Sequence, residues 1–274
     1  MSAPLAPDGE PRLRWHERLN ALNVSLLLFA AAVLASAPVL RGSGRELDYL
    51  GNLRRFLGYF LPPDFSIWPQ VVAALGETMQ IAVMATALSI VLSVPLAMAA
   101  AQNIAPRALV LAARMALNVV RTIPSLIWAL MAVAVVGPNP LAGVLGLTCY
   151  SVGYLGKFFS DAFESVRADA AVGLRAIGAS AVQAFQYGLW PQAKPLIWSQ
   201  ALWMLEYNIR SASIIGYVGA GGIGVQLHTF QEYYQWEKFA AVLVYILALV
   251  VALDLFGEWA RRQISRQFGL PAPR

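Results

Sequence analysis

Two charged side chains interrupt an apolar stretch in the last third of the chain, and they could act on an anion. Glu206 and Arg210 are four residues apart, so on a helix they share one face, with the acid N-terminal to the base. We therefore predict that they form an ion pair. Two roles stay open. The pair is architectural, or Arg210 contacts an oxyanion through its planar fork while Glu206 weakens that grip. Asn208 and Ser211 add neutral hydrogen-bonding groups nearby.

A glycine-rich segment follows, in which Gly219, Gly221, Gly222 and Gly224 include a match to G-x-G-x-x-G. A dinucleotide site needs these glycines inside a βαβ unit. Here an apolar helical stretch precedes them, and the sequence has no βαβ alternation, so we reject a nucleotide site. Two interpretations remain: close helix packing through small residues, or a bend that shapes the outer mouth of a path and offers backbone N–H groups to an anion.

The cysteine and histidine content of the chain does not indicate a catalytic site or a metal site. Cys149 is the one cysteine, so no intrachain disulfide is possible. His16 and His228 are far apart and have no companion ligands at metal-binding spacing. An enzyme would also need a nucleophile with acid–base partners at one interface. We expect no metal, no catalytic residue and no cofactor in this chain.

The composition is typical of a protein that spans a membrane. Hydrophobic residues make up 58% of the chain and charged residues 13%, against about 25% charged residues in soluble domains. Three long stretches, 19–40, 78–106 and 122–156, contain no charge, and about 20 apolar residues suffice to cross a bilayer. We therefore predict an all-α polytopic membrane protein. The net charge of +5 then marks cytoplasmic segments rather than a nucleic-acid partner.

About six transmembrane helices are predicted. Pro124 interrupts the third, which we expect to kink there with a freed carbonyl. Arg121 lies three residues earlier, and we expect Arg121 and Pro124 to be structural, as a cap or a subunit contact. Gly137 to Pro140 is a turn signal. The spans are about Asn23 to Leu40, Thr78 to Ala100, Ala108 to Val136, Leu141 to Phe159, Pro195 to Val218 and Phe239 to Trp259.

Basic residues orient these spans. They occur before the first span, between the second and third, after the fourth and after the sixth, all on one side, which places both termini in the cytoplasm. The loop after the first span also contains arginines, but it is long and mixed with acids. Ala35-Ser36-Ala37 resembles a signal-peptidase site, yet Pro38 follows it, so we favour an uncleaved anchor. The expected organisation is a cytoplasmic segment 1–22, a first transmembrane helix 23–40, an extracytoplasmic loop 41–77, a core 78–259 with a cytoplasmic loop 161–194, and a cytoplasmic tail 260–274.

The loop 161–194 contains two predicted short helices, Ala170 to Ile177 and Ala181 to Gly188, closed by Gly178 and stopped at Pro191. Their apolar faces lie outside the bilayer and need a cover. The cover is either the cytoplasmic ends of the chain's own spans or a partner protein.

Gly178-Ala179-Ser180, with Pro191 thirteen residues after Gly178, resembles the cytoplasmic coupling loop of importer-type ABC transporter permeases. That loop usually opens with Glu-Ala-Ala six residues before the glycine, where this chain has Val172, Gly173 and Leu174. The departure removes the glutamate but keeps the helix–turn–helix pattern. The resemblance implies contact with an ATPase through Val172, Gly173, Leu174, Arg175, Ala176, Gly178, Ala179, Ser180 and Pro191.

Further stretches are similar to the phosphonate-type permease subfamily, whose members import phosphonates, phosphite, hypophosphite or phosphate. They are YFLPPDFS, RTIPSLIWAL, LGKFFSDAFES, YGLWPQAKP and EYNIRSASIIGYVGAGGIG.

This resemblance implies a multi-pass permease subunit with an importer-permease fold in the bacterial cytoplasmic (inner) membrane. Two copies would form the translocation path as a homodimer. An ATP-binding cassette ATPase dimer would hydrolyse ATP–Mg, and an extracytoplasmic binding protein would deliver substrate. The expected path residues are Glu206, Asn208, Arg210, Ser211, Gly219, Gly221, Gly222 and Gly224.

Two other functions compete with this one. A self-contained secondary transporter usually has internal inverted repeats and more spans, and no repeat is visible. A membrane-embedded enzyme, such as a lipid phosphatase, would need the clustered acid–base groups that the sequence lacks.

Overall fold

The computed structural model describes residues 21–41 and 48–267, and these residues form helices and turns without a strand. The chain divides into two units, Met1–Phe56 and Leu57–Arg274. In the first unit, α1 (Ala21–Ser36) continues into a 3₁₀ turn, η1 (Ala37–Arg41). No residue of α1 is buried and it is apolar all round, as expected of a helix surrounded by lipid. A short helix, α2 (Tyr49–Gly58), runs across the boundary between the units.

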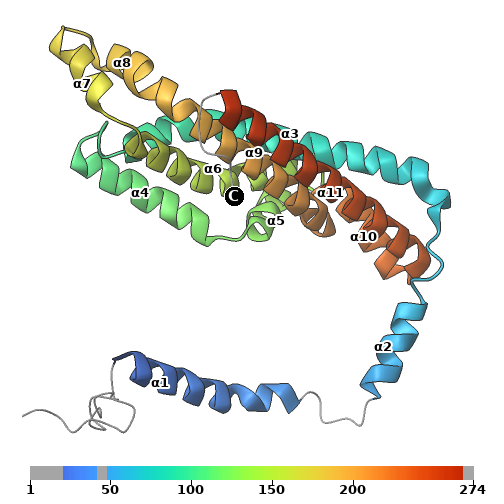
Figure 1. Cartoon of the computed structure of the whole chain (residues 1–274). Coiled ribbons are helices and arrows are strands. Elements are labelled where there is room, and N and C mark those ends of the chain that lie inside the picture. Colours follow the sequence, from blue (N-terminus) through green and yellow to red (C-terminus); the bar gives the residue numbers. More distant parts are fainter. Residues whose placement is uncertain (1–20, 42–47, 268–274) are drawn as a thin grey trace, which may run out of the picture. The chain divides into compact units, whose positions relative to one another are not determined.

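The second unit is a bundle in which α6 occupies the middle and packs against α3, α4, α5 and α9 (Figure 1). Its last helix, α11, packs along α9 and α10. The long helices are α3 (Trp68–Ala100), α4 (Arg107–Thr122), α5 (Ser125–Val136), α6 (Pro140–Ser165), α9 (Trp190–Ile215) and α11 (Trp236–Gln267). The short elements are η2 (Phe65–Ile67), α7 (Asp169–Ala176), α8 (Ala181–Ala184), η3 (Phe185–Leu189), η4 (Gly216–Val218) and α10 (Ile223–Glu232).

Small residues let α6 approach its neighbours closely. A Cβ atom at Gly146 would lie 2.6 Å from the Ala129 Cα atom, and one at Gly156 would lie 2.6 Å from the Leu117 Cδ2 atom. Helices inside a bilayer gain little from the hydrophobic effect between them, so close van der Waals packing of this kind stabilises the bundle.

Three of the described helical segments are long and apolar enough to cross a membrane: Ala21–Leu40, Phe65–Ala100 and Trp236–Gln267. The pair α4 and α5 makes a fourth candidate, bent by 86°. The helices α6 and α9 have 26 residues each, about 39 Å at 1.5 Å per residue. Both carry charged residues as well as buried Ser, Thr or Asn side chains.

Some predicted boundaries are wrong. The helix α3 starts at Trp68 rather than Thr78, and the predicted loop 41–77 contains α2, η2 and the first turns of α3. Before η2, the Asp64 carboxylate accepts a hydrogen bond from the Ser66 backbone N–H, at 2.9 Å. Hydrogen bonding from Ser66 lowers the pKa of Asp64. Asp64 therefore caps the start of a helical turn, and the segment is not a continuous loop.

The third predicted span breaks instead of kinking. Pro124 is the N-cap of α5, and Ile123 before it is extended, so α4 ends at Thr122. A proline disfavours helical conformation in the residue before it and lacks the N–H that would continue the ladder. The Trp128 indole N–H donates to the Val120 carbonyl across the break, at 3.3 Å.

Candidate functional site

The predicted coupling segment forms a helical hairpin, which we define as α7, α8 and the turn between them, residues 169–184. Gly178 in the turn has φ +94°, while a Cβ atom there would meet nothing within 4 Å. The glycine is therefore required by backbone conformation and not by space. Ser180 caps α8 in a capping box with Gln183, which satisfies two N-terminal amides.

The coupling hairpin exposes large apolar side chains at the end of the bundle from which it projects (Figure 1). Val172, Ile177 and Val182 are 64%, 82% and 72% exposed. Val172, at the position of the family's glutamate, carries no charge. The acid of this helix is Asp169, which pairs with Arg167 at 2.8 Å. Gly173, Leu174, Arg175 and Ala176 complete α7, and Ala179 lies in the turn.

The end of the hairpin differs from the prediction. Pro191 does not stop the second helix. Instead, α8 runs through a π-helical segment, η3, into α9, and Pro191 occupies the first turn of α9. The Trp190 backbone N–H donates to the Phe185 carbonyl, so the helix continues across the junction although Pro191 has no N–H to donate. Gln192 ties the junction together, since its side-chain amide donates to the Arg167 carbonyl at 3.0 Å and to the Gly188 carbonyl at 2.7 Å.

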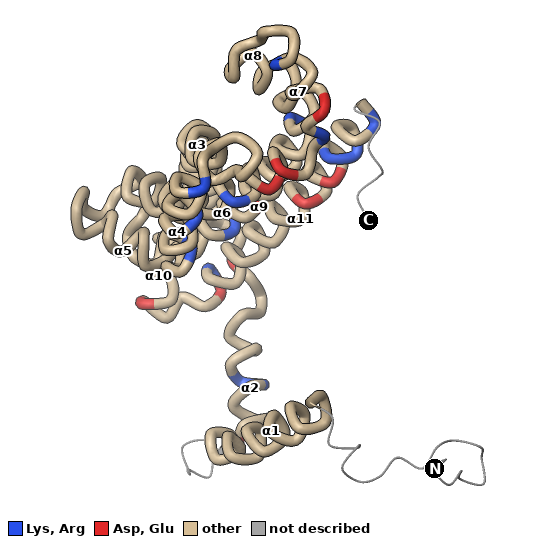
Figure 2. Tube along the Cα trace, turned by 90° about the vertical axis from the view of Figure 1, so that its left-hand side faces the viewer, with Lys and Arg blue, Asp and Glu red and all other residues tan. Residues whose placement is uncertain are grey.

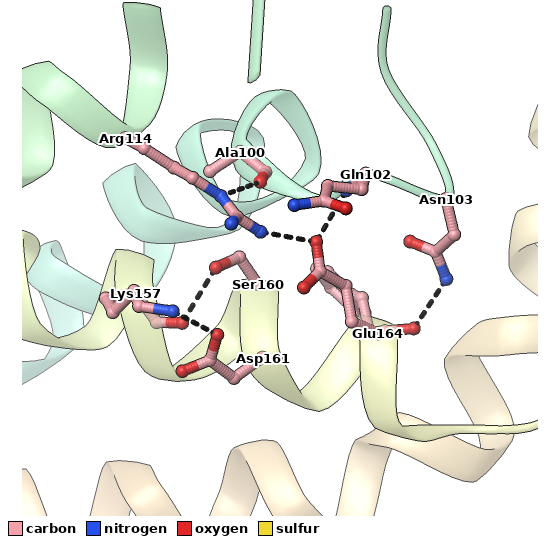
Figure 3. Close-up of polar contacts among 9 residues, drawn as sticks. Ala100, Gln102, Asn103, Arg114, Lys157, Ser160, Asp161 and Glu164 are labelled. Carbon is pink, nitrogen blue, oxygen red and sulfur yellow. Dashed lines mark hydrogen bonds and ion pairs between the residues drawn. The ribbon is translucent and has the colours of Figure 1, made fainter. Parts of the chain in front are cut away.

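A polar network that we did not predict from the sequence fastens the α3–α4 loop to the C-terminal end of α6 (Figure 3). The Glu164 carboxylate accepts from the Arg114 guanidinium and from the Gln102 backbone N–H, both at 2.6 Å. Asn103 donates to the Phe163 carbonyl at 2.7 Å, and Arg114 also donates to the Ala100 carbonyl at 2.9 Å. One turn earlier on α6, Lys157 pairs with Asp161. The four-residue spacing of this last pair was a readable signal, whereas Arg114 and Glu164 are 50 residues apart.

The predicted Glu206–Arg210 pair is wrong, because both side chains turn toward α11. Glu206 pairs with Arg261, and Arg210 pairs with Asp254 at 2.8 Å. Gly257 on α11 makes this possible, since a Cβ atom there would overlap the Glu206 carboxylate. Each helix therefore contributes one carboxylate and one arginine to the contact, and the charges of α9 are neutralised by α11.

Asn208 and Ser211 lie on the buried face of α9. Asn208 is fully buried. Its amide donates to the Thr86 hydroxyl of α3 at 2.9 Å, and its carbonyl accepts from the Ser151 hydroxyl of α6 at 2.9 Å. These bonds join three helices, so Asn208 is a packing residue in a single copy of the chain.

The glycine segment makes the sharp connection from α9 to α10. Gly219, Gly221 and Gly222 have φ +82°, +80° and +75°, a region that side chains disfavour. The Ile223 backbone N–H donates to the Thr78 hydroxyl at 2.8 Å, and a Cβ atom at Gly224 would clash with the Ser213 carbonyl. The close-packing interpretation is therefore confirmed. The helix α10, which follows, was not predicted.

A shallow pocket of about 380 Å³ lies beside these glycines. Glu77 lines it and comes close to Gly221. A carboxylate at this place is unfavourable for an anion, so the segment's geometry supports a structural turn more than an anion-binding one.

Arg121 and Pro124 flank the break between α4 and α5. The Arg121 guanidinium carbon lies 5.0 Å from the centre of the Tyr154 ring, within cation–π range. Among the described residues, no group of three or more His, Cys, Asp or Glu side chains could hold a metal ion.

Comparison with known proteins identifies the chain's relatives. Residues 114–266 match the family described as "Binding-protein-dependent transport system inner membrane component". The phosphite transport system permease protein PtxC of Stutzerimonas stutzeri is 38% identical over 92% of this chain and 92% of its own. The phosphate-import permease protein PhnE of Mycolicibacterium smegmatis is 32% identical over 74% of this chain and 39% of its own.

Among solved structures, the MetNI methionine ABC transporter in inward-facing conformations matches 73% of this chain and 99% of its own, with a TM-score of 0.65 and 22% identity. An amino acid ABC transporter matches 80% of this chain with a TM-score of 0.60 and 17% identity. These likenesses concern the fold. Together with the sequence relatives, they show that the chain belongs to the inner-membrane permease components of binding-protein-dependent ABC transporters.

Proposed function

We propose that this chain is the permease subunit of an ATP-driven importer of phosphonate or a related phosphorus oxyanion: phosphite, hypophosphite or phosphate. The substrate class follows from relatives named for phosphite or phosphate, including one that is similar over 92% of this chain. The observation that supports the ATP-driven mechanism is the coupling hairpin. Its large apolar side chains are exposed at one end of the bundle, where a separate ATPase could cover them.

The charge distribution supports a cytoplasmic position for the hairpin. Lys and Arg residues occur at its end of the bundle and along the last turns of α11, together with several Asp and Glu residues (Figure 2). Basic residues mark the cytoplasmic side, whereas acidic residues have little influence on orientation. The basic residues of that end are Arg107, Arg114, Lys157, Arg167, Arg175, Lys194, Arg261, Arg262 and Arg266. Within residues 57–267, the opposite end has Asp64, Glu77, Glu232 and Glu237 with a single basic residue, Lys238. In this orientation an ATPase dimer, carrying ATP–Mg, docks on the hairpin.

A contiguous exposed apolar surface is typical of a protein interface. Tyr187, 66% exposed just after α8, extends the hairpin surface with an aromatic ring of the kind that anchors interfaces. We propose that Val172, Ile177 and Val182 fill a groove of the ATPase. Because Val172 replaces the family's glutamate, this contact depends on apolar burial rather than on an ion pair.

Two permease copies and an extracytoplasmic binding protein complete the proposed importer. We propose a homodimer with the path between the copies. The pairing of Arg210 with Asp254 supports the architectural role for Glu206 and Arg210 over a role in anion contact. We assign the glycine segment to the outer boundary of the path.

The test is ATPase activity of the purified complex. The chain is co-expressed with the ATP-binding and binding-protein subunits of its own organism, and ATP hydrolysis is measured in nanodiscs with phosphite, phosphate or methylphosphonate. We expect co-purification with the ATPase and hydrolysis that rises only with substrate-loaded binding protein. Failure to associate with the ATPase, or no response to any of these anions, would contradict the proposal.

A further inference from the structure

Five aromatic side chains of α6 and α9 form a closed circuit of ring contacts, which we call the aromatic cluster. Tyr150, Tyr154 and Phe158 follow one another at four-residue spacing on α6, and Trp203 and Tyr207 do so on α9. The ring centres are 4.8 Å apart for Tyr150 and Tyr154, and 5.1 Å apart for Tyr150 and Tyr207. Contacts of 6.2, 5.8 and 6.0 Å close the circuit through Phe158 and Trp203.

One cation reaches this cluster, from the last turn of α4. The Arg121 guanidinium lies over the Tyr154 ring, and Gly153 makes room for it, since a Cβ atom there would lie 3.1 Å from the Arg121 Cγ atom. Within residues 21–41 and 48–267, no carboxylate forms an ion pair with Arg121. By contrast, Arg114 and Arg210 each have a carboxylate partner. The described part of the chain therefore provides no carboxylate that neutralises Arg121.

The polar groups of the cluster are half-buried in one copy of the chain. Tyr150, Tyr154 and Tyr207 each lie eight or more residues from both ends of their helices, which is more than two helical turns. A guanidinium at such depth is costly against lipid, and ionisable groups in spanning helices usually face a bundle interior or a water-filled cavity. The cluster therefore needs an aqueous or protein surface opposite it.

We propose that Arg121, with the hydroxyl groups of Tyr150, Tyr154 and Tyr207, is a contact site for the transported oxyanion on the wall of the path. This proposal deepens the proposed function and rests on it. The guanidinium offers planar paired donors that match phosphate-like oxygens, and the phenols add neutral donors. A single charge among neutral groups holds an anion weakly, as a transport site must. The sequence had instead suggested a structural Arg121, and an anion contact at Arg210 as one of two open roles.

The first test measures access and charge independently of transport. Tyr150→Cys is made in a Cys149→Ser background, and the complex in nanodiscs is treated with a methanethiosulfonate that carries either a sulfonate or a trimethylammonium group. We expect the anionic reagent to react at least fivefold faster, and we expect this preference to disappear when Arg121→Gln is added. Tyr207→Cys repeats the test from α9 in case Tyr150→Cys does not fold.

Three results would overturn the site: no reaction with either reagent, reaction without charge preference, or a preference that survives Arg121→Gln. The second test is ATP-driven phosphite uptake at saturating binding protein. We expect Arg121→Gln to lower uptake at least tenfold and Arg121→Lys to lower it less, while the matched control Arg107→Gln, at the other end of α4, keeps it.

The two proposals fail differently. If the wild-type complex takes up no phosphorus oxyanion, the proposed function is wrong, and the reagent test still reports whether the cluster is an anion-selective aqueous surface. If the wild-type complex transports phosphite and Arg121→Gln transports it equally well, only the site is wrong.

Discussion

The ion pair between Glu206 and Arg261 provides the most quantitative test of the bundle's packing. The Glu206 side chain is 11% exposed and that of Arg261 is 22% exposed, so the pair is largely desolvated. Removing one partner of such a pair leaves an uncompensated charge and costs about 3–5 kcal/mol. We expect Glu206→Gln to lower the free energy of unfolding by about 3 kcal/mol. Glu206→Gln/Arg261→Gln, which removes both charges, should cost only about 1 kcal/mol.

A double-mutant cycle in mixed detergent micelles, with unfolding by SDS titration, gives the coupling energy directly. With a cost of about 3 kcal/mol for each single variant and about 1 kcal/mol for the double variant, we expect a coupling of about 5 kcal/mol for Glu206 with Arg261. The pair of Arg210 with Asp254 has side chains that are 41% and 52% exposed, so solvent screens it and its coupling should be about 0.2–1 kcal/mol. Glu206 and Arg210 pair with residues of α11 and not with each other, so they should couple by less than about 0.5 kcal/mol. A Glu206–Arg210 coupling as large as that of Glu206 with Arg261 would refute the arrangement of α9 against α11.

Three further predictions concern the hairpin, the core and the α3–α4 loop. Gly178→Val should strain the turn by about 1–3 kcal/mol and reduce ATPase association, while Gly178→Asn, which tolerates positive φ, should retain it; equal pull-down of the ATPase by both variants would contradict this. Asn208→Ala should lower the free energy of unfolding by about 2–4 kcal/mol through a cavity and lost interhelical hydrogen bonds, and an SDS titration that shows under about 1 kcal/mol would argue against its packing role. Glu164→Gln should weaken the bonds to Arg114 and Gln102, so amide exchange in residues 101–105 should rise, and unchanged exchange there would show that the network does not hold the loop.

Local sequence signals predicted the features that depend on local physics. The spans follow from uninterrupted apolar stretches, which only a bilayer or a core can accept. The turn at Gly178 and an interruption at Pro124, expected as a kink and found as a break, follow from residues whose backbone preferences act on their immediate neighbours. The glycine segment belongs to the same class, since its positive φ angles are readable from the residue type.

Local sequence signals did not predict contacts between residues far apart in the chain, because these contacts depend on how each helix is rotated about its axis. Four-residue spacing predicted that Glu206 pairs with Arg210, but the choice of partner depends on α11, which faces both side chains. The same limit concealed the Arg114–Glu164 network. Arg121 was placed correctly beside the proline, yet its contact with an aromatic cluster of α6 and α9 could be found only once the three helices were in place.

The central claim is that this chain, driven by a separate ATPase that docks on its hairpin, moves a phosphorus oxyanion inward. The most direct test is uptake of radiolabelled phosphite into proteoliposomes that contain the full complex and enclose ATP–Mg, with loaded binding protein outside. We predict uptake that requires enclosed ATP and stops when the ATPase subunit is omitted. Uptake by the permease alone under an ion gradient would contradict the claim and favour a self-contained transporter.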